Sequence, residues 1–325
     1  MVDFSKISTF TTERSEIISQ KSILIVSNSD DAHATAVHDR LKGRSIRAHR
    51  LDSDTFTSKQ HSWRIRPDAN HKSHSSWFIP DIDVVWYRKV VFPEVADAVQ
   101  SFISQETKGL FDCVLANYRN CRWINPRDRL AEAKPKIAQL ECAKDVGLRI
   151  PDTLITTSVD ALKEFAARHD GHIVAKPIQA QVVGSDDRVL VVGTRQLTSG
   201  YFESATKFSP CYTQEKLLLK SEIRVVVFGA QLHSFRLTAK EKADDLKQLK
   251  LSQIDHERCE LDESTSRKIR SLMLLYGLEF GAIDLAVVDE KEPVFLELNP
   301  NGQWLWLQYM TGENLIDPFI DLLCS

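Results

Sequence analysis

The sequence lacks several features that would assign it to a class at once. It has no excess of positive charge, with 42 Lys and Arg against 45 Asp and Glu and a net charge of 42 − 45 = −3. We therefore expect no nucleic-acid partner, because phosphate binding depends on a surplus of cations. No run approaches the roughly 18 apolar residues of a membrane helix, and Met1–Lys21 lacks the pattern of a secretory signal peptide. A cytoplasmic protein without a membrane partner is expected.

The sequence also lacks paired cysteines. Its six cysteines are scattered and form no C-x-x-C motif: Cys113, Cys121, Cys142, Cys211, Cys259 and Cys324. This spacing predicts reduced thiols rather than a disulfide framework or a zinc site. Hydrophobic residues make up 42% and charged residues 27%, which is the balance of a chain that buries a core. At roughly 100–200 residues per domain, 325 residues predict two or three domains.

The first part of the chain has the pattern of a parallel sheet. Ser22–Ser27 and Ile46–Leu51 are predicted strands, and a helix capped by Ser29 or Asp30 lies between them. Strand, helix and strand at these spacings indicate a βαβ unit, because parallel strands need a crossover connection. We assign residues 1–127 to an N-terminal α/β domain.

Two further units follow. Residues 128–207 alternate predicted helices and strands and form a smaller central unit. Residues 208–325 favour antiparallel pairing, since Gly229 and Ala230 make a tight turn between two predicted strands. The fold class is therefore α/β, with an α+β C-terminal part.

The strongest chemical signal is the closing hairpin, AIDLAVVDEKEPVFLELNPNGQ. Asp284 lies on its first strand, while Glu297 and Asn299 lie two residues apart on the second and so share one face. Two carboxylates and an amide oxygen are hard ligands of the kind that Mg²⁺ takes together with water and phosphate oxygens. Trp304 and Trp306 follow, at the spacing of side chains on one face of a strand.

Two lysines upstream are placed as phosphate ligands would be. Lys176 ends a predicted strand and precedes Pro177, so its ammonium faces a loop. Lys136 lies in the first turn of a predicted helix, where a cation is unfavourable against the helix dipole. A ligand role explains that placement, although either lysine alone would be taken for a surface charge.

The segment TQEKLLLKSEIRVVV adds a possible adenine site. Gln214 and Glu215 end a predicted strand, and the chain runs on through Leu217, offering backbone groups and a carboxylate to a base. Glu222 is placed for ribose hydroxyls, and Arg224 leaves the same face of its strand. Alone, this pattern is an ordinary charged hairpin.

In this order, the pieces resemble the ATP-grasp superfamily over about residues 130–325, most specifically in the E-x-N-P segment. Three stretches resemble the graspetide maturases, which make microviridin-type ester- and amide-linked peptides. The first stretch is SNSDDAHATAV. The second, VVWYRK, is similar to a W-Y-R-R motif, and the third, FLELNPNGQWLWLQYMTG, is similar to a closing E-x-N-P-x-G-Q segment. The resemblance implies an N-terminal parallel-sheet domain, a small central domain and a C-terminal antiparallel-sheet domain.

The resemblance also implies an activity and its ligands. ATP and Mg²⁺ would be the cofactors, a ribosomal precursor peptide with leader and core the substrate, and a homodimer the assembly. Arg224, or else Arg258 or Arg236, would stabilise the acyl phosphate formed on a peptide carboxylate, and Arg88 of VVWYRK would contact the substrate. A hydroxyl or amine of the same peptide would then close a lactone or lactam.

Two alternatives stay open at this point. The first is an ATP-grasp ligase that adds a free amino acid to a peptide or protein carboxylate. The second is a nucleotide-binding regulator without chemistry, against which the complete set Asp284, Glu297 and Asn299 argues.

Overall fold

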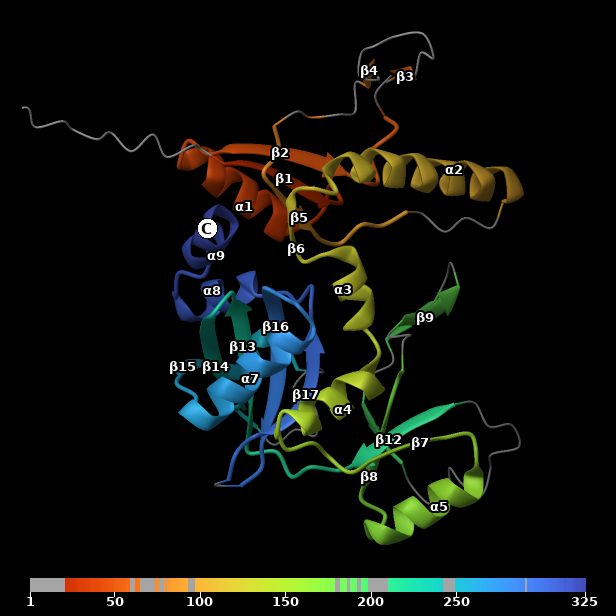
Figure 1. The fold of residues 1–325 in the computed structure, drawn as a ribbon. Helices are drawn as coiled ribbons and strands as arrows, with labels where there is room; N and C mark the ends of the chain where they lie inside the picture. The colour runs from red at the N-terminus through yellow and green to blue at the C-terminus, as the bar shows by residue number, and fades with distance from the viewer. Residues whose placement is uncertain are drawn as a thin grey trace, which may run out of the picture.

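The structure is a computed structural model that describes residues 21–58, 62–64, 74–75, 79, 81–92, 97–178, 182–185, 188–191, 194–197, 210–241, 249–289 and 291–325. Three larger sheets organise these residues: a parallel sheet near the N-terminus, a central antiparallel sheet and a C-terminal antiparallel sheet (Figure 1). None of the helices in this part of the chain has the length and apolar character to cross a bilayer.

The N-terminal sheet has the order β2-β1-β5-β6, and its paired strands are all parallel. Its strands are β1 (Ser22–Ser27), β2 (Arg47–Asp52), β5 (Val84–Tyr87) and β6 (Arg122–Ile124). Both faces are covered, because alternate residues of β1 pack into two different cores: Ile23 and Ile25 toward α1 (Ala32–Gly43), and Leu24 and Val26 toward α2 (Ala98–Leu115). This explains why β1 is a continuous apolar run. The short elements β3 (Trp63–Arg64), β4 (His74–Ser75) and η1 (Ala116–Tyr118) complete this part.

The central sheet has the order β11-β8-β12-β7 and is antiparallel. Its strands are β7 (Thr153–Thr156), β8 (Ile173–Lys176), β11 (Arg195–Gln196) and β12 (Cys211–Glu215). Helix α5 (Val159–Arg168) covers one face with Leu162 and Phe165, and Ser158 caps its N-terminus. A separate hairpin pairs β9 (Val182–Ser185) with β10 (Arg188–Val191).

The C-terminal sheet has five antiparallel strands in the order β15-β14-β13-β16-β17. They are β13 (Ser221–Phe228), β14 (Gln231–Ala239), β15 (Ile254–Cys259), β16 (Phe280–Val287) and β17 (Val294–Asn299). Helices α4 (Lys136–Asp145) and α7 (Glu263–Leu275) pack on one face in a shared core. The remaining short elements are α3 (Arg127–Glu132), η3 (Leu251–Gln253), α8 (Leu305–Thr311) and α9 (Ile316–Cys324).

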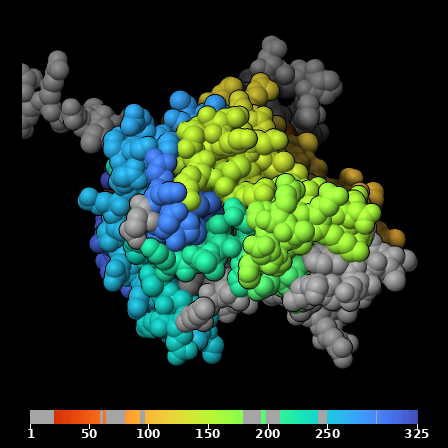
Figure 2. Space-filling model, turned by 90° about the horizontal axis from the view of Figure 1, so that it is seen from below, coloured from red at the N-terminus to blue at the C-terminus, as the bar shows by residue number. Residues whose placement is uncertain are grey.

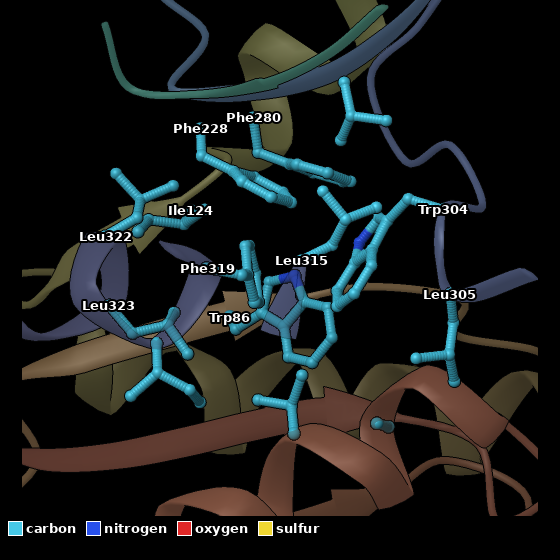
Figure 3. Packing of buried hydrophobic residues seen from close by; sticks show 14 of the residues in the cluster. Trp86, Ile124, Phe228, Phe280, Trp304, Leu305, Leu315, Phe319, Leu322 and Leu323 are labelled. Carbon is cyan, nitrogen blue, oxygen red and sulfur yellow. The ribbon is translucent and has the colours of Figure 1, made fainter. Parts of the chain in front are cut away.

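A core of aromatic residues joins the N-terminal and C-terminal sheets. Phe228 and Phe280 of the C-terminal sheet lie over Phe319 of α9, which packs on Trp86 of β5 with ring centroids 4.7 Å apart (Figure 3). Trp304 closes the cluster, with its centroid 5.5 Å from that of Phe228. Because such rings dominate core energetics, these two sheets form one packed body, with α9 beside α1 (Figure 1).

The mixed α/β fold class is confirmed, and several local predictions need correction. The cap of α1 is Asp31, whose carboxylate accepts from the His33 amide, and not Ser29 or Asp30. Trp304 and Trp306 do not share a strand, because α8 begins at Leu305. 

The domain boundaries stay a proposal. Strand β12 pairs with β7 and β8 of the central sheet, so we propose that the boundary between the central and C-terminal units lies after Glu215 rather than at residue 207. The boundary near residue 127 remains as predicted from the sequence.

Candidate active site

A row of side chains crosses the C-terminal sheet. Arg258, Phe235, Arg224, Asp284 and Glu297 lie directly opposite one another on β15, β14, β13, β16 and β17. Residues opposite one another in an antiparallel sheet share a face. The pairing therefore places both carboxylates and two of the three predicted arginines on one side of the sheet.

The two carboxylates and Asn299 form an oxygen-rich corner at the sheet edge. Asp284 is 4% exposed and accepts a hydrogen bond from Arg224 Nη1. Asn299 lies two residues after Glu297, opposite Ala282, and its Oδ1 accepts from the Asn301 amide at 3.1 Å. An amide oxygen has a second lone pair, so this contact leaves the oxygen able to bind a cation.

The donor set suits Mg²⁺. Among the described residues no three His, Cys, Asp or Glu side chains cluster as a metal site. Two carboxylates and one amide oxygen are nevertheless what Mg²⁺ uses when water and phosphate supply its other ligands. The hydrogen bond from Arg224 Nη1 also holds the buried Asp284 carboxylate in place.

A side chain from α4 holds the strand that carries Glu297 and Asn299. The Gln139 side chain is buried, and its Nε2 donates to the Leu298 and Ala133 carbonyls at 2.8 and 2.6 Å. Its Oε1 accepts from the Leu298 amide at 2.9 Å. β17 is an edge strand, so Gln139 takes the place of a neighbouring strand at the residue between the two candidate ligands.

A cavity of about 60 Å³, open to solvent, lies between the central and C-terminal sheets. Five of the six residues predicted to bind the nucleotide line it, and these are Lys176, Gln214, Glu215, Leu217 and Glu222. The wall is completed by Val174, Thr194, Lys216, Leu219 and Leu296. Figure 2 shows the central unit in yellow-green beside the blue C-terminal unit, the two parts whose residues form this cavity.

The sixth residue, Lys136, lies next to the same strand end. Its Nζ donates to the Pro177 carbonyl at 3.0 Å, one residue after Lys176. The structure therefore brings the two predicted phosphate-binding lysines together, although they are 40 residues apart in the sequence.

Gln214, which lines the cavity, links its own strand β12 to the neighbouring strand β7. Gln214 is 1% exposed, and its Nε2 donates to the Tyr212 hydroxyl at 2.9 Å and to Thr153 Oγ1 at 3.0 Å. Burial, and then the nearby Glu297 carboxylate, raise the pKa of Tyr212 to about 12. The phenol thus stays protonated between the cavity and Glu297. The Glu215 carboxylate accepts from the Asp152 amide at 2.9 Å.

The remaining predicted residues are placed differently. Arg258 is on the site face but half exposed, stacked on Phe235 with its guanidinium 5.6 Å from the ring centre. At about 4.8 Å per strand, it lies about 10 Å from Arg224. Arg236 pairs with Ile223, and its Nη1 donates to Ser221 Oγ at 3.2 Å. It therefore points to the opposite face of the sheet.

Arg88 lies outside this row. Its side chain is fully buried at the end of β5 and forms an ion pair with Asp31. Burial alone would raise the pKa of Asp31, but the Arg88 charge and the Ser27 hydroxyl outweigh it and hold that pKa below its usual value.

Sequence reasoning missed Gln139, His33, Asn125 and Gly302. A polar residue on the buried side of a helix was the available signal for Gln139. His33 and Gly302 lie within the SNSDDAHATAV and FLELNPNGQWLWLQYMTG stretches, which suggested no role for them, and no local pattern indicates Asn125.

Comparison with known proteins supports the fold. No protein-family model matches the sequence, and no curated protein matches it by sequence. Among solved structures, the macrocyclase MdnC of Microcystis aeruginosa, bound with precursor peptide MdnA, has a TM-score of 0.79 at 22% identity, covering 93% of this chain and 99% of that one. A RiPP-associated ATP-grasp ligase of Chryseobacterium gregarium, in complex with ADP and a leader and core peptide, has a TM-score of 0.79 at 23% identity over 94% and 96%.

A third structure, the ATP-grasp ligase PsnB complexed with a phosphomimetic variant of its minimal precursor, Mg and ADP, has a TM-score of 0.74 at 20% identity over 94% and 98%. The similarity runs over nearly the whole of each chain. The chain therefore has the fold of the ATP-grasp ligases.

Proposed function

We propose that the protein is an ATP-dependent macrocyclase that joins carboxylates of a ribosomally made precursor peptide to hydroxyls or amines of the same peptide. One observation carries this proposal: the cavity lined by Lys176, the adjacent Lys136, and the corner of Asp284, Glu297 and Asn299 lie at one junction between two sheets. Three structures of the same fold are of ligases or macrocyclases with precursor peptides, and two of them hold ADP.

The residues divide the work by position. Gln214, Glu215, Leu217 and Glu222 line the cavity; the first three would contact the base, and Glu222 would bind the ribose hydroxyls. Lys136 and Lys176 would hold phosphates as point charges. Because phosphoryl transfer needs charge neutralisation and positioning more than covalent help, this chain contributes mainly preorganised charge.

The metal corner would hold Mg²⁺ through Asp284, Glu297 and Asn299. When bound, Mg²⁺ neutralises the charge of the nucleotide phosphates. Arg224 is fixed by Asp284 and by the Gln303 carbonyl at 3.1 Å, and it would stabilise charge developing on the transferred group. Of the three predicted arginines, Arg224 has the direct contact with the corner.

A peptide carboxylate oxygen attacks the γ-phosphorus of ATP, ADP leaves, and an acyl phosphate remains. A hydroxyl or amine of the same peptide then attacks the acyl carbon, inorganic phosphate leaves, and the new ester or amide has formed with net loss of one water. A cytoplasmic location and a homodimer remain predictions.

The direct test is intact-mass spectrometry of candidate precursor peptides incubated with enzyme, ATP and Mg²⁺. We expect losses of whole waters with the wild-type protein and none with Glu297→Gln. Glu292→Gln is a matched control, because this carboxylate is on the same hairpin but accepts from Ser264 Oγ at 2.8 Å and pairs with Lys268. Full ATP-dependent activity of Glu297→Gln would refute the assignment, and a gain of amino-acid mass would instead indicate a ligase that adds free amino acids.

A further inference from the structure

The loop that follows the candidate metal ligands is held by side chains of the N-terminal unit. We define this loop as Pro300–Leu305. Asn125, at the end of β6, donates from Nδ2 to the Pro300 carbonyl at 3.0 Å. His33, in the first turn of α1, accepts at Nε2 from the amides of Trp304 and Leu305, both at 2.9 Å. Each of these side chains is buried and lies at the carboxyl-end edge of the parallel sheet.

His33 is fixed in one protonation state. Burial, and then the Arg88 charge, lower the pKa of His33 to about 3, so the ring is neutral at pH 7. Since Nε2 accepts two hydrogen bonds, the ring proton is on Nδ1, which faces Asp31 Oδ1 at 3.7 Å. The ring also packs edge-on against Trp304, with centroids 5.2 Å apart.

Asp31 is fixed in turn by Arg88. Arg88 Nε donates to Asp31 Oδ2, and Ser27 Oγ donates to the same oxygen at 2.8 Å. Arg88 Nη1 reaches the Gly302 carbonyl at 3.5 Å, the outer limit of a hydrogen bond. The buried Nη2 has no hydrogen-bond partner in the described part of the chain, so direct contact of Arg88 with a ligand is the competing role.

The other side of the loop touches the site. Arg224 Nη2 donates to the Gln303 carbonyl, the residue just before the two amides that His33 accepts. The Gly302 amide donates to the Asn299 carbonyl at 3.1 Å. A shift of the loop would therefore move both Arg224 and Asn299.

We propose that His33, oriented by the Arg88–Asp31 ion pair, is a positioning residue that fixes the Pro300–Leu305 loop and through it Arg224 and Asn299. Arg88 then acts through Asp31 and His33 and does not bind the substrate. This assigns the SNSDDAH and WYRK segments to the geometry of the metal corner. The inference rests on the proposed function.

A pair of variants separates positioning from general stability. Glutamine places its oxygen at about the reach of imidazole Nε2, whereas asparagine reaches only as far as Nδ1. We expect His33→Asn to weaken binding of Mg²⁺·ADP about tenfold, by isothermal titration calorimetry, and to lower kcat by 10–100-fold with peptide KM changed less than twofold. His33→Gln should restore both within about threefold. Arg40→Gln, at an exposed position on the same helix whose side chain pairs with Asp317 at 2.6 Å, is the control.

The indole N–H resonance of Trp304, assigned with Trp304→Phe, reports the loop directly. It should move in His33→Asn and in Arg88→Lys, and it should keep its wild-type position in His33→Gln. The proposal is overturned if folded His33→Asn binds Mg²⁺·ADP as the wild type does, or if Arg88→Lys leaves the Trp304 signal and the kcat unchanged while raising only the peptide KM. Nucleotide affinity and the Trp304 signal decide this even if no peptide is modified, so a failure of the proposed function is distinguishable.

Discussion

Gly302 is the position where a single added methyl group tests the site geometry. A Cβ at Gly302 would lie 2.4 Å from the Cβ of Ala282, and 3.2 Å from both Arg224 Nη2 and the Asn299 carbonyl oxygen. The first distance cannot be relieved by a rotamer change, because both carbons are attached directly to backbone. Gly302→Ala must therefore displace the loop or β16.

The expected cost follows from overpacking. Forcing one extra methyl into a close-packed core typically costs about 1–3 kcal/mol. Because the displaced loop holds Arg224 through Gln303 and joins directly to Asn299, we expect a larger effect on function, with kcat/KM lowered at least about tenfold.

The double variant Gly302→Ala/Ala282→Gly is the internal control. It removes the 2.4 Å contact and leaves the two contacts at 3.2 Å, which need shifts of only a few tenths of an ångström. Urea denaturation of the wild type, both single variants and the double variant gives the coupling free energy. We expect the double variant to recover at least about 1 kcal/mol relative to additivity. Additive effects would show that the two positions are not in close contact and would refute the reasoning.

Two further perturbations give measurable outcomes. Gln139→Leu removes the hydrogen-bond partners of the Leu298 amide and carbonyl. Each buried unsatisfied group costs about 1–3 kcal/mol, and because water reaches part of an edge strand, we expect about 2–4 kcal/mol of destabilisation in urea and weaker Mg²⁺·ATP binding. A loss below about 0.5 kcal/mol would show that Gln139 does not hold β17 in place. Because the pKa of His33 is lowered from 6.5 to about 3 by burial and by Arg88, the unfolded chain takes up this proton first as the pH falls. The contribution of neutral His33 to the free energy of unfolding is complete above pH 6.5 and is lost toward pH 3. Between pH 7 and pH 5, the free energy of unfolding should therefore fall by about 2 kcal/mol more in the wild type than in His33→Gln. Equal decreases would be inconsistent with a neutral buried His33.

Local patterns predicted much of the fold. The apolar run Ser22–Ser27 is strand β1 over the same residues, and the alternation around Glu297 places it on the site face of β17. Residues predicted for the nucleotide site were grouped only by chain order, yet Lys176 and Glu222 line one cavity. Strands and the residues at their ends can be predicted locally, because the alternation of side chains and the point where an apolar run stops are visible in the sequence.

The contacts that hold the site in place could not be predicted in this way. Gln139, His33 and Asn125 bond to the backbone of segments 154–272 residues away in sequence, and a backbone group has no side-chain pattern to read. The sequence favoured Arg224 over Arg258 and Arg236 but could not place their side chains, and strand register puts Arg224 and Arg258 on one face and Arg236 on the other. A one-residue difference in register decides the face of a strand.

The most direct test of the central claim is the mass of a precursor peptide after incubation with the enzyme, ATP and Mg²⁺, followed by methyl-esterification of the carboxylates that remain. The account predicts a loss of whole waters, with one carboxylate protected from esterification for each water lost. A gain of amino-acid residues, or water loss that persists in Glu297→Gln, would contradict it.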